Sequence, residues 1–287
     1  MKKYLFIVLS LFMIIPGVVS ASEVYYSNYY GISMTEGEYN NLLQLGFTKE
    51  EIHHMEVEEF NSNKNIEGNL ETTTTRYFVS IIRYDSTGKM ISNSDMEISE
   101  EDYNNESILS ISNRVANGGY VETSYKRMET TIAAAGSKYR YKVTLNWKIM
   151  PATRSYDIIG IGFNPTVYLN SSLVFNQTSC VSTNCTNTTT INNSNVGFNG
   201  AGVSFKLPTS TSITTLRSYF YFDVSKNVSN TITSMYAYGD YSHATKTISG
   251  GAAQGYYVDQ SGIVLSSEIS SYYDTITTAD ASWYGSW

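Results

Sequence analysis

Within one stretch of the chain, residues 138–150, the first twelve residues alternate strictly between apolar and polar side chains. The odd positions from 139 to 149 carry Tyr, Tyr, Val, Leu, Trp and Ile, whereas the even positions from 138 to 148 carry Lys, Arg, Lys, Thr, Asn and Lys. This period of two, in aromatic and β-branched residue types, is typical of a β-strand, because successive side chains of a strand point to opposite faces. A helix would scatter the apolar set around its circumference. We therefore predict a long strand with one apolar face and one solvated, cationic face.

The first 22 residues are predicted to be a signal peptide. Lys2 and Lys3 precede an apolar run over residues 4–15, a Pro-Gly pair ends that run, and small residues follow at 19–21. The run is too short to span a bilayer, and no later stretch of the sequence is long and apolar enough. We expect a secreted, extracellular protein with no transmembrane segment in the mature chain.

The mature chain divides into three parts by composition. We expect a small acidic helical module over residues 23–61, a polar linker over 62–74, and an antiparallel β domain over 75–287. Strand and turn signals alternate through the third part and helix signals are few, which predicts a mainly β fold, an antiparallel β-sandwich or jelly-roll. The net charge of the whole chain is −7, and this lack of a basic excess argues against a nucleic-acid partner.

Two capping boxes predict helices inside the module. Thr35 precedes Glu38 by three residues and Thr48 precedes Glu51 by three, so that hydroxyl and carboxylate can satisfy free amides at each helix start. Gly46 is expected to end the first helix in the left-handed conformation. Because units of fewer than about 40 residues rarely fold stably alone, we expect the module to dock on another part of the chain.

Residues 42–52 read Leu-Leu-Gln-Leu-Gly-Phe-Thr-Lys-Glu-Glu-Ile. This segment resembles an "LLxLGFTxxEI" helical module at the front of uncharacterised β-rich secreted proteins of Gram-positive bacteria. The resemblance implies an exported protein with no assigned activity, and it carries over no catalytic residue and no ligand.

Cys180 and Cys185 are the two cysteines of the chain. A local disulfide at a hairpin tip is the expected state in an exported protein. Free thiols are the alternative, and a metal site would need two further soft ligands that the neighbouring sequence does not supply. Because the chain also has no phosphate-binding glycine loop, dinucleotide fingerprint or zinc-protease motif, we predict no metal and no cofactor.

Basic residues concentrate between positions 114 and 154. Arg140, Lys142 and Lys148 share one face of the predicted strand and form a possible binding surface. An anionic wall polymer, a lipid surface or the acidic module of the same chain could occupy this surface, or it could simply be solvated. If the module docks there, neutralising the three side chains should loosen it.

The chain has 25 tyrosines, and Trp283 and Trp287 lie at its C-terminal end. Exposed rings of this kind form stacking platforms for sugars or rigid contacts for proteins. The alternative is that most of them belong to the sheets and the core. We include Trp283 and Trp287 in the possible binding surface.

Residues 238–243 form the strongest catalytic candidate. Tyr241 and His243 should share one strand face and Asp240 the other, and a distant acid could complete a site beside His243. A structural strand edge or turn is the competing interpretation. The acids of the β domain cannot be paired from sequence, so the two carboxylates of a glycosidase cannot be assigned.

These observations favour a non-enzymatic binding protein that acts at the cell surface or in the medium. Its partner would be a cell-surface glycan or protein. One alternative is a membrane-active or pore-forming β protein, because residues 72–84 and 120–148 form long amphipathic strands of the kind that a pore stem needs. The other alternative is a secreted hydrolase that acts on a polysaccharide.

Overall fold

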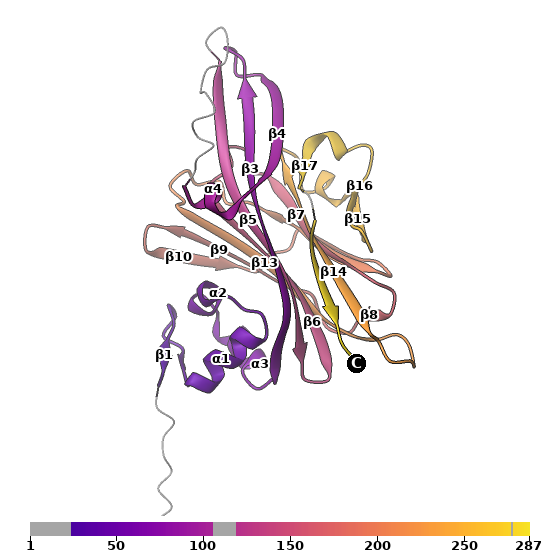
Figure 1. The fold of residues 1–287 in the computed structure, drawn as a ribbon. Helices are drawn as coiled ribbons and strands as arrows, with labels where there is room; N and C mark the ends of the chain where they lie inside the picture. The colour runs from indigo at the N-terminus through magenta and orange to yellow at the C-terminus, as the bar shows by residue number, and fades with distance from the viewer. Residues whose placement is uncertain (1–23, 106–118, 277) are drawn as a thin grey trace, which may run out of the picture.

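The computed structural model describes residues 24–105, 119–276 and 278–287, so the predicted signal peptide lies outside the described residues. Two antiparallel sheets pack face to face, which confirms the predicted β-sandwich (Figure 1). Two small two-stranded sheets and four short α-helices surround them within the described ranges. No helix among the residues described is both long enough and apolar enough to cross a bilayer.

The first sheet has eight strands in the order β10-β9-β13-β6-β5-β3-β4, with β8 beside β13. Strands β3, β4 and β5 extend beyond the rest of the sandwich (Figure 1). The bounds of the strands are β3 Gly68–Tyr84, β4 Met90–Ile98, β5 Tyr120–Ala135, β6 Lys138–Ile149, β8 Val167–Leu169, β9 Val174–Val181, β10 Asn184–Thr188 and β13 Thr215–Lys226.

The second sheet has six strands in the order β11-β12-β7-β14-β17, with β18 also paired to β14. The bounds are β7 Tyr156–Phe163, β11 Asn193–Val196, β12 Gly200–Lys206, β14 Ser234–Ala244, β17 Tyr273–Thr275 and β18 Ala279–Tyr284. A hairpin of β15 Tyr256–Asp259 and β16 Gly262–Leu265 lies on the outer face of this sheet, together with two 3-10 turns, Ala252–Gln254 and Ser270–Tyr272.

The main core fills the space between the two sheets. The odd positions of β6 from Tyr139 to Trp147 point into it as predicted, and Trp147 is 2% exposed. Ile149, after a register shift, packs against another cluster instead. Apolar residues of β13, such as Phe220 and Phe222, meet Ile161 and Phe163 of β7 in the same cluster. The predicted apolar face of β6 is therefore confirmed.

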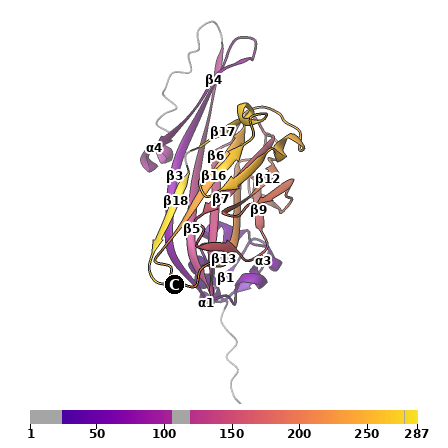
Figure 2. The ribbon, with the colours of Figure 1, turned by 90° about the vertical axis from the view of Figure 1, so that its right-hand side faces the viewer.

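The acidic module consists of a short ribbon and three helices at one end of the molecule (Figures 1 and 2). Both capping boxes form, and Gly46 has φ 84° where the first helix ends. The bounds are β1 Tyr26–Ser27, β2 Ser33–Met34, α1 Glu36–Gln44, α2 Lys49–His53 and α3 Val57–Asn63. A fourth helix, α4 Glu100–Asn105, packs beside β3.

The prediction that the cationic face of β6 is solvated is wrong. Arg140 and Lys142 are 2% and 1% exposed, because the helical module covers them. Apolar residues of the module, including Phe47, pack with Tyr219 and Tyr221 of β13 in one cluster. The module therefore docks on the cationic face of its own chain, which was one of the predicted occupants.

The prediction of a polar linker over residues 62–74 is also wrong, because most of these residues belong to a helix or a strand. Residues 62–63 belong to α3, and residues 68–74 form the first part of β3, where they pair with β5. The threonines of this segment read as polar, but Thr is a favoured strand residue whose backbone is satisfied by the ladder. The sheet therefore begins almost directly after the module.

Glycines of β7 and β12 allow the β15–β16 hairpin to lie close to the second sheet. A Cβ atom at Gly200 would lie 2.7 Å from Val258 Cγ1, and one at Gly202 would lie 2.8 Å from Val258 Cγ2. A Cβ atom at Gly162 would collide with the carbonyl oxygen of Asp259. These contacts leave no room for larger side chains, so the glycines set the position of the hairpin and of its turn.

Candidate functional site

A row of tyrosines lies on the outer face of the second sheet. Along β14 burial alternates, so that Met235 and Ala237 enter the core while Tyr236 and Tyr238 face outward. The rings of Tyr236 and Tyr238 are nearly parallel, with centroids 6.2 Å apart, and Tyr284 of β18 meets Tyr236 edge-on at 6.1 Å. Tyr284 is 71% exposed. We call these three residues the tyrosine row.

A polar notch of about 400 Å³ adjoins the tyrosine row. The turn of the β15–β16 hairpin supplies Gln260 and Ser261, and β18 supplies Asp280, which is the register partner of Tyr238. Asp259 holds the turn by accepting hydrogen bonds from the amide and hydroxyl of Ser261 at 2.8 and 2.6 Å. Among the described residues, the lining is Asn164, Tyr238, Gln260, Ser261, Thr278 and Asp280.

The phenol of Tyr238 in the row remains neutral at physiological pH. Burial raises the pKa of Tyr238 above its ordinary value, and the nearby Asp280 and Tyr236 raise it further. A neutral phenol can both donate and accept a hydrogen bond while its ring offers an apolar face. With the carboxylate of Asp280 and the amides of Gln260 and Asn164, the notch presents groups that hydrogen-bond to hydroxyl-rich ligands.

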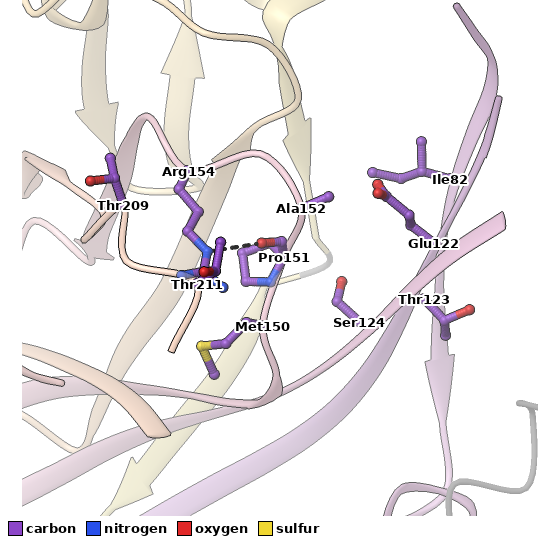
Figure 3. A pocket seen from close by; sticks show the side chains of 10 residues that line it. All are labelled: Ile82, Glu122, Thr123, Ser124, Met150, Pro151, Ala152, Arg154, Thr209 and Thr211. Atoms are coloured by element: carbon purple, nitrogen blue, oxygen red, sulfur yellow. Dashed lines mark hydrogen bonds between the residues drawn. The ribbon is translucent and has the colours of Figure 1, made fainter. Parts of the chain in front are cut away.

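A larger pocket, of about 540 Å³, lies between β3, β5 and the loop after β6. Its two charged groups, Glu122 and Arg154, stand on opposite walls (Figure 3). Arg154 is held by backbone carbonyls, since it donates to Pro151 at 3.3 Å and also to Ser210. None of the described residues that line this pocket is aromatic, and for that reason the tyrosine row and its notch are the better candidate.

The predicted binding surface is closed to an external partner at Arg140 and Lys142, whereas Lys148 is only half-buried. Lys142 Nζ lies 2.7 Å from Glu51 Oε2 of the module and also contacts Thr144 Oγ1. Arg140 donates to Asn63 of α3 at 2.6 Å and pairs with Asp223 at 2.9 Å. Lys148 donates to the carbonyls of Tyr103 and Asn104 and so caps the C-terminal end of α4.

The two tryptophans do not form an exposed platform. Trp283 is 7% exposed, because it points inward from β18, and its indole NH donates to Glu71 Oε2 at 2.9 Å. Trp287 is partly buried, and its ring lies 4.7 Å from that of Tyr139. Both rings therefore pack against the first sheet, which corrects their assignment to a binding surface.

Asp240, Tyr241 and His243 divide between the two faces of β14 as the alternation predicted. Tyr241 and His243 point into the sandwich, where both contact the fully buried carboxylate of Asp157, with His243 Nδ1 at 2.9 Å. His243 is 2% exposed. This group has no access for a substrate, so it is a structural network of the core.

Asp240 points outward and anchors the hairpin. Its carboxylate accepts hydrogen bonds from the amides of Ile263 at 2.8 Å and Tyr241 at 2.7 Å. Burial raises its pKa to about 6 despite these two hydrogen bonds. Asp240 therefore fixes the β15–β16 hairpin, whose turn lines the notch.

The predicted disulfide between Cys180 and Cys185 is confirmed. The two residues are directly opposed at the tip of the β9–β10 hairpin, with Cα atoms 4.0 Å apart. His54 of the module lies within 4.8 Å of both sulfurs. Because the sulfurs are bonded to each other, only the imidazole of this trio could bind a metal ion.

The tyrosine row was missed at the level of sequence. Tyr236 and Tyr238 recur with a period of two inside a predicted strand, which is the signal that they share one face. The sequence does not reveal that this face is the outer one, or that β18 brings Tyr284 beside it. Those facts depend on the pairing of β14 with β18.

No protein-family model matches this chain, and no curated protein matches it. Among solved structures, it is similar to the major pilin subunit BcpA of Bacillus cereus, with a TM-score of 0.28 and 4% identity over 70% of this chain; the chain spans 63% of that subunit. It is also similar to the collagen-binding domain of the surface protein RspB of Erysipelothrix rhusiopathiae, with a TM-score of 0.25 and 8% identity over 59% of this chain and 71% of that domain.

A further similarity is to a structure described as manganese lipoxygenase of Gaeumannomyces graminis with part of a zonadhesin of Komagataella pastoris. Its TM-score is 0.30 and its identity 7%, over 77% of this chain and 86% of that one. At these scores the matches assign the chain to no family.

Proposed function

We propose that this chain is an exported, non-enzymatic protein that binds a cell-surface glycan through the tyrosine row and the adjoining notch. The observation that supports the proposal most directly is the placement of Tyr236, Tyr238 and Tyr284 beside a notch lined by carboxylate, amide and hydroxyl groups. The signal-peptide pattern and the disulfide support export, because disulfides persist in oxidising compartments outside the cytosol.

The chemistry of a sugar matches both parts of the site. One face of a pyranose ring presents C–H groups that pack on an aromatic ring, and its edge presents hydroxyls that exchange hydrogen bonds with carboxylates and amides. Rings held on paired strands lose little conformational freedom on binding. The notch volume of about 400 Å³ lies at the small end of the range of ligand pockets, which suits one short segment of a glycan.

The structure also bears on the pore-forming alternative. The segments 72–84 and 120–148, which a pore stem would use, belong to β3, β5 and β6 and pair with each other in the first sheet. Insertion as a stem would require most of these ladder bonds to move. We therefore expect no dye release from liposomes at any pH.

The proposal is tested by a glycan array and by binding of the purified protein to whole cells. The double variant Tyr236→Ala, Tyr238→Ala should lose about 2- to 10-fold in affinity per ring, which corresponds to about 0.5–1.5 kcal/mol for each aromatic contact. Tyr168→Ala is the control, because Tyr168 is a strand tyrosine with an exposed side chain that lies on the first sheet, away from the row.

The Tyr168→Ala protein should bind as the wild type does. Tyr168→Ala, at an exposed position, should unfold at wild-type temperature. Tyr236 and Tyr238 are half-buried, so thermal unfolding of the double variant must show that it is folded at the temperature of the binding assay. Wild-type glycan affinity in the double variant, or the absence of binding to every glycan and cell type, would contradict the proposal.

A further inference from the structure

A lysine and an aspartate lie side by side inside the sandwich, away from the tyrosine row. Lys126 of β5 is completely buried, and its Nζ is 3.0 Å from Oδ2 of Asp95 on β4. Strand β3 runs between the two, with Phe78 opposite Lys126 and Ser80 opposite Asp95. Both side chains therefore point to the same, inner face of the first sheet, and Ser80 donates a hydrogen bond to Asp95.

A second carboxyl group, that of Asp274 on β17, completes the cluster. Burial raises the pKa of Asp274 to about 7, and a hydrogen bond with Asp95 and the charge of Asp95 contribute to this rise. Burial alone would raise the pKa of Asp95 as well, but the ammonium of Lys126 and hydrogen bonds from Asp274 and Ser80 outweigh it and lower that pKa. Asp274 is thus the acid that retains a proton near neutral pH.

The walls of the cluster are aromatic. Lys126 Nζ lies 5.2 Å from the centre of the Trp147 ring, and the imidazole of His243 lies 5.2 Å from the same ring on the opposite sheet. In a site of this kind, where water does not solvate the charges, an ion pair and its neutral acid and amine forms approach one another in free energy. A neutral amine is a nucleophile, whereas an ammonium is not.

The other buried lysine–carboxylate pair of the molecule provides a comparison. Glu51 accepts hydrogen bonds from Lys142, from Thr144 and from the amide of Thr48, which stabilise its ionised form. The carboxyl group of raised pKa in that region, Glu59, is hydrogen-bonded to Tyr219 instead. Lys126 contacts the carboxyl group of Asp95, and that same carboxyl group is hydrogen-bonded to the protonated acid Asp274. No other lysine–carboxylate pair among the described residues has both contacts.

We propose that Lys126 and Asp95 join in an intramolecular isopeptide bond, with Asp274 as the acid that transfers protons. The ammonium of Lys126 first passes a proton to the carboxylate of Asp95. The neutral Nζ then attacks Cγ of Asp95 and forms the C–N bond. The C–OH bond breaks, the hydroxyl leaves as water with the proton of Asp274, and Nζ returns its surplus proton to Asp274.

The step balances without any other reactant. One amine and one carboxylic acid become one amide and one water, and nothing is oxidised or reduced. The reacting groups need not be brought together from solution, because the fold holds them in contact, and such placement lowers barriers strongly. The product would tie the edge strand β4 to β5 across β3, so the exposed edge of the first sheet could not separate from it.

Mass spectrometry of the purified, reduced and denatured protein tests the proposal, once N-terminal sequencing has fixed the start of the mature chain. The wild-type chain should weigh one water molecule less than its sequence requires. Trypsin, which cannot cut after an acylated lysine, should release a branched peptide that joins the segments around residues 95 and 126. Full mass with separate peptides would overturn the proposal.

Three variants assign the roles. Lys126→Arg should have the full mass of its sequence, because a guanidinium does not attack a carboxyl group. Asp274→Asn keeps the shape of the side chain but has no acidic proton, so it should also have full mass while retaining the wild-type circular dichroism. Lys142→Arg, in the comparison pair, should keep the missing water. A deficit that persists in Lys126→Arg, or that maps to another pair of residues, would contradict the assignment.

Discussion

The outer faces of the two sheets are covered in opposite ways. On the first sheet, the helical module covers β6 and β13 through buried charges, with Lys142 bonded to Glu51 and Arg140 bonded to Asn63 and Asp223. On the second sheet, a hairpin covers β7 and β12 through close contacts between Val258 and glycines. The first cover combines an apolar cluster with buried charges, whereas the second rests mainly on close apolar contacts.

The difference shows what each cover depends on. A buried ion pair gains little net stability, but removal of one partner leaves an unpaired charge and is strongly destabilising. A close-packed glycine surface tolerates changes of pH and salt, but it does not tolerate added volume. The module should therefore respond to charge and pH. The hairpin should respond mainly to added volume, with Asp240, whose pKa burial raises to about 6, as a titratable anchor.

The largest expected effect is that of Lys142→Met. The substitution leaves the carboxylate of Glu51 buried without its cation, because Glu51 is 1% exposed, and it should lower the free energy of unfolding by about 3–5 kcal/mol. Urea denaturation measures this change. Lys148→Met is the matched control, since Lys148 lies on the same strand face but caps α4 and is only half-buried; it should cost less than about 1 kcal/mol.

Adding Glu51→Gln to Lys142→Met should restore part of the stability, because the remaining amide can be buried without a counter-charge. If Lys142→Met and Lys148→Met lowered the free energy of unfolding equally, the ion pair of Lys142 with Glu51 would not be the contact that holds the module.

The strand β6 was predictable and its surroundings were not. Twelve alternating residues identify a strand and its apolar face, because that information is local. The partner of Lys142 is 91 residues away in the sequence, so no window around β6 could show that its cationic face is buried. The local capping boxes at Thr35 and Thr48 and the disulfide were predictable for the same reason that β6 was.

The wrong predictions also arise from contacts between residues that lie far apart in the sequence. Trp283 reads as an exposed terminal aromatic, but its position depends on the pairing of β18 with β14 and on a contact with Glu71, 212 residues earlier. The partner of His243, Asp157, lies on another strand, 86 residues away. Contacts set by sheet topology decide which outward faces stay open. The tyrosine row could not be predicted for the same reason, because it depends on the pairing of β14 with β18.

A smaller effect, in the same module, should depend on pH. Burial raises the pKa of Glu59 from its ordinary value near 4.5 to about 7. Between these two values the folded chain holds a proton that the unfolded chain has lost, so the contribution of Glu59 to stability falls as the pH rises and is fully lost above about pH 7. The groups that face it are Tyr219, Tyr221, Glu51 and Lys142.

Glu59→Gln removes this titration. Hydrogen exchange of the module amides should show protection that falls between pH 5.5 and 8 in the wild type and stays level in the variant, which should be up to about 3 kcal/mol more stable at pH 8. The hairpin amides over residues 256–265 serve as the internal control and should respond alike in both proteins. A variant with the wild-type pH profile would show that Glu59 does not govern the module.

The smallest expected effect concerns the hairpin cover. In Gly200→Ala the new Cβ atom would meet Val258 Cγ1 at 2.7 Å and the Asp259 oxygen at 2.9 Å. We expect a loss of about 1–3 kcal/mol in unfolding free energy, the usual cost of overpacking, at low and high salt alike. Because the hairpin turn lines the notch, glycan affinity should fall as well. Gly251→Ala is the control, since its nearest contact would be 3.9 Å away.

The most direct test of the docked module is digestion by a glutamate-specific protease, whose sites include Glu50, Glu51, Glu58 and Glu59. In the wild type these bonds should resist cleavage while the module covers β6. The triple variant Arg140→Gln, Lys142→Gln, Lys148→Gln should be cut within residues 33–61 at least tenfold faster, because the module has lost its charge partners. Unchanged resistance of residues 33–61 in that variant would contradict the account.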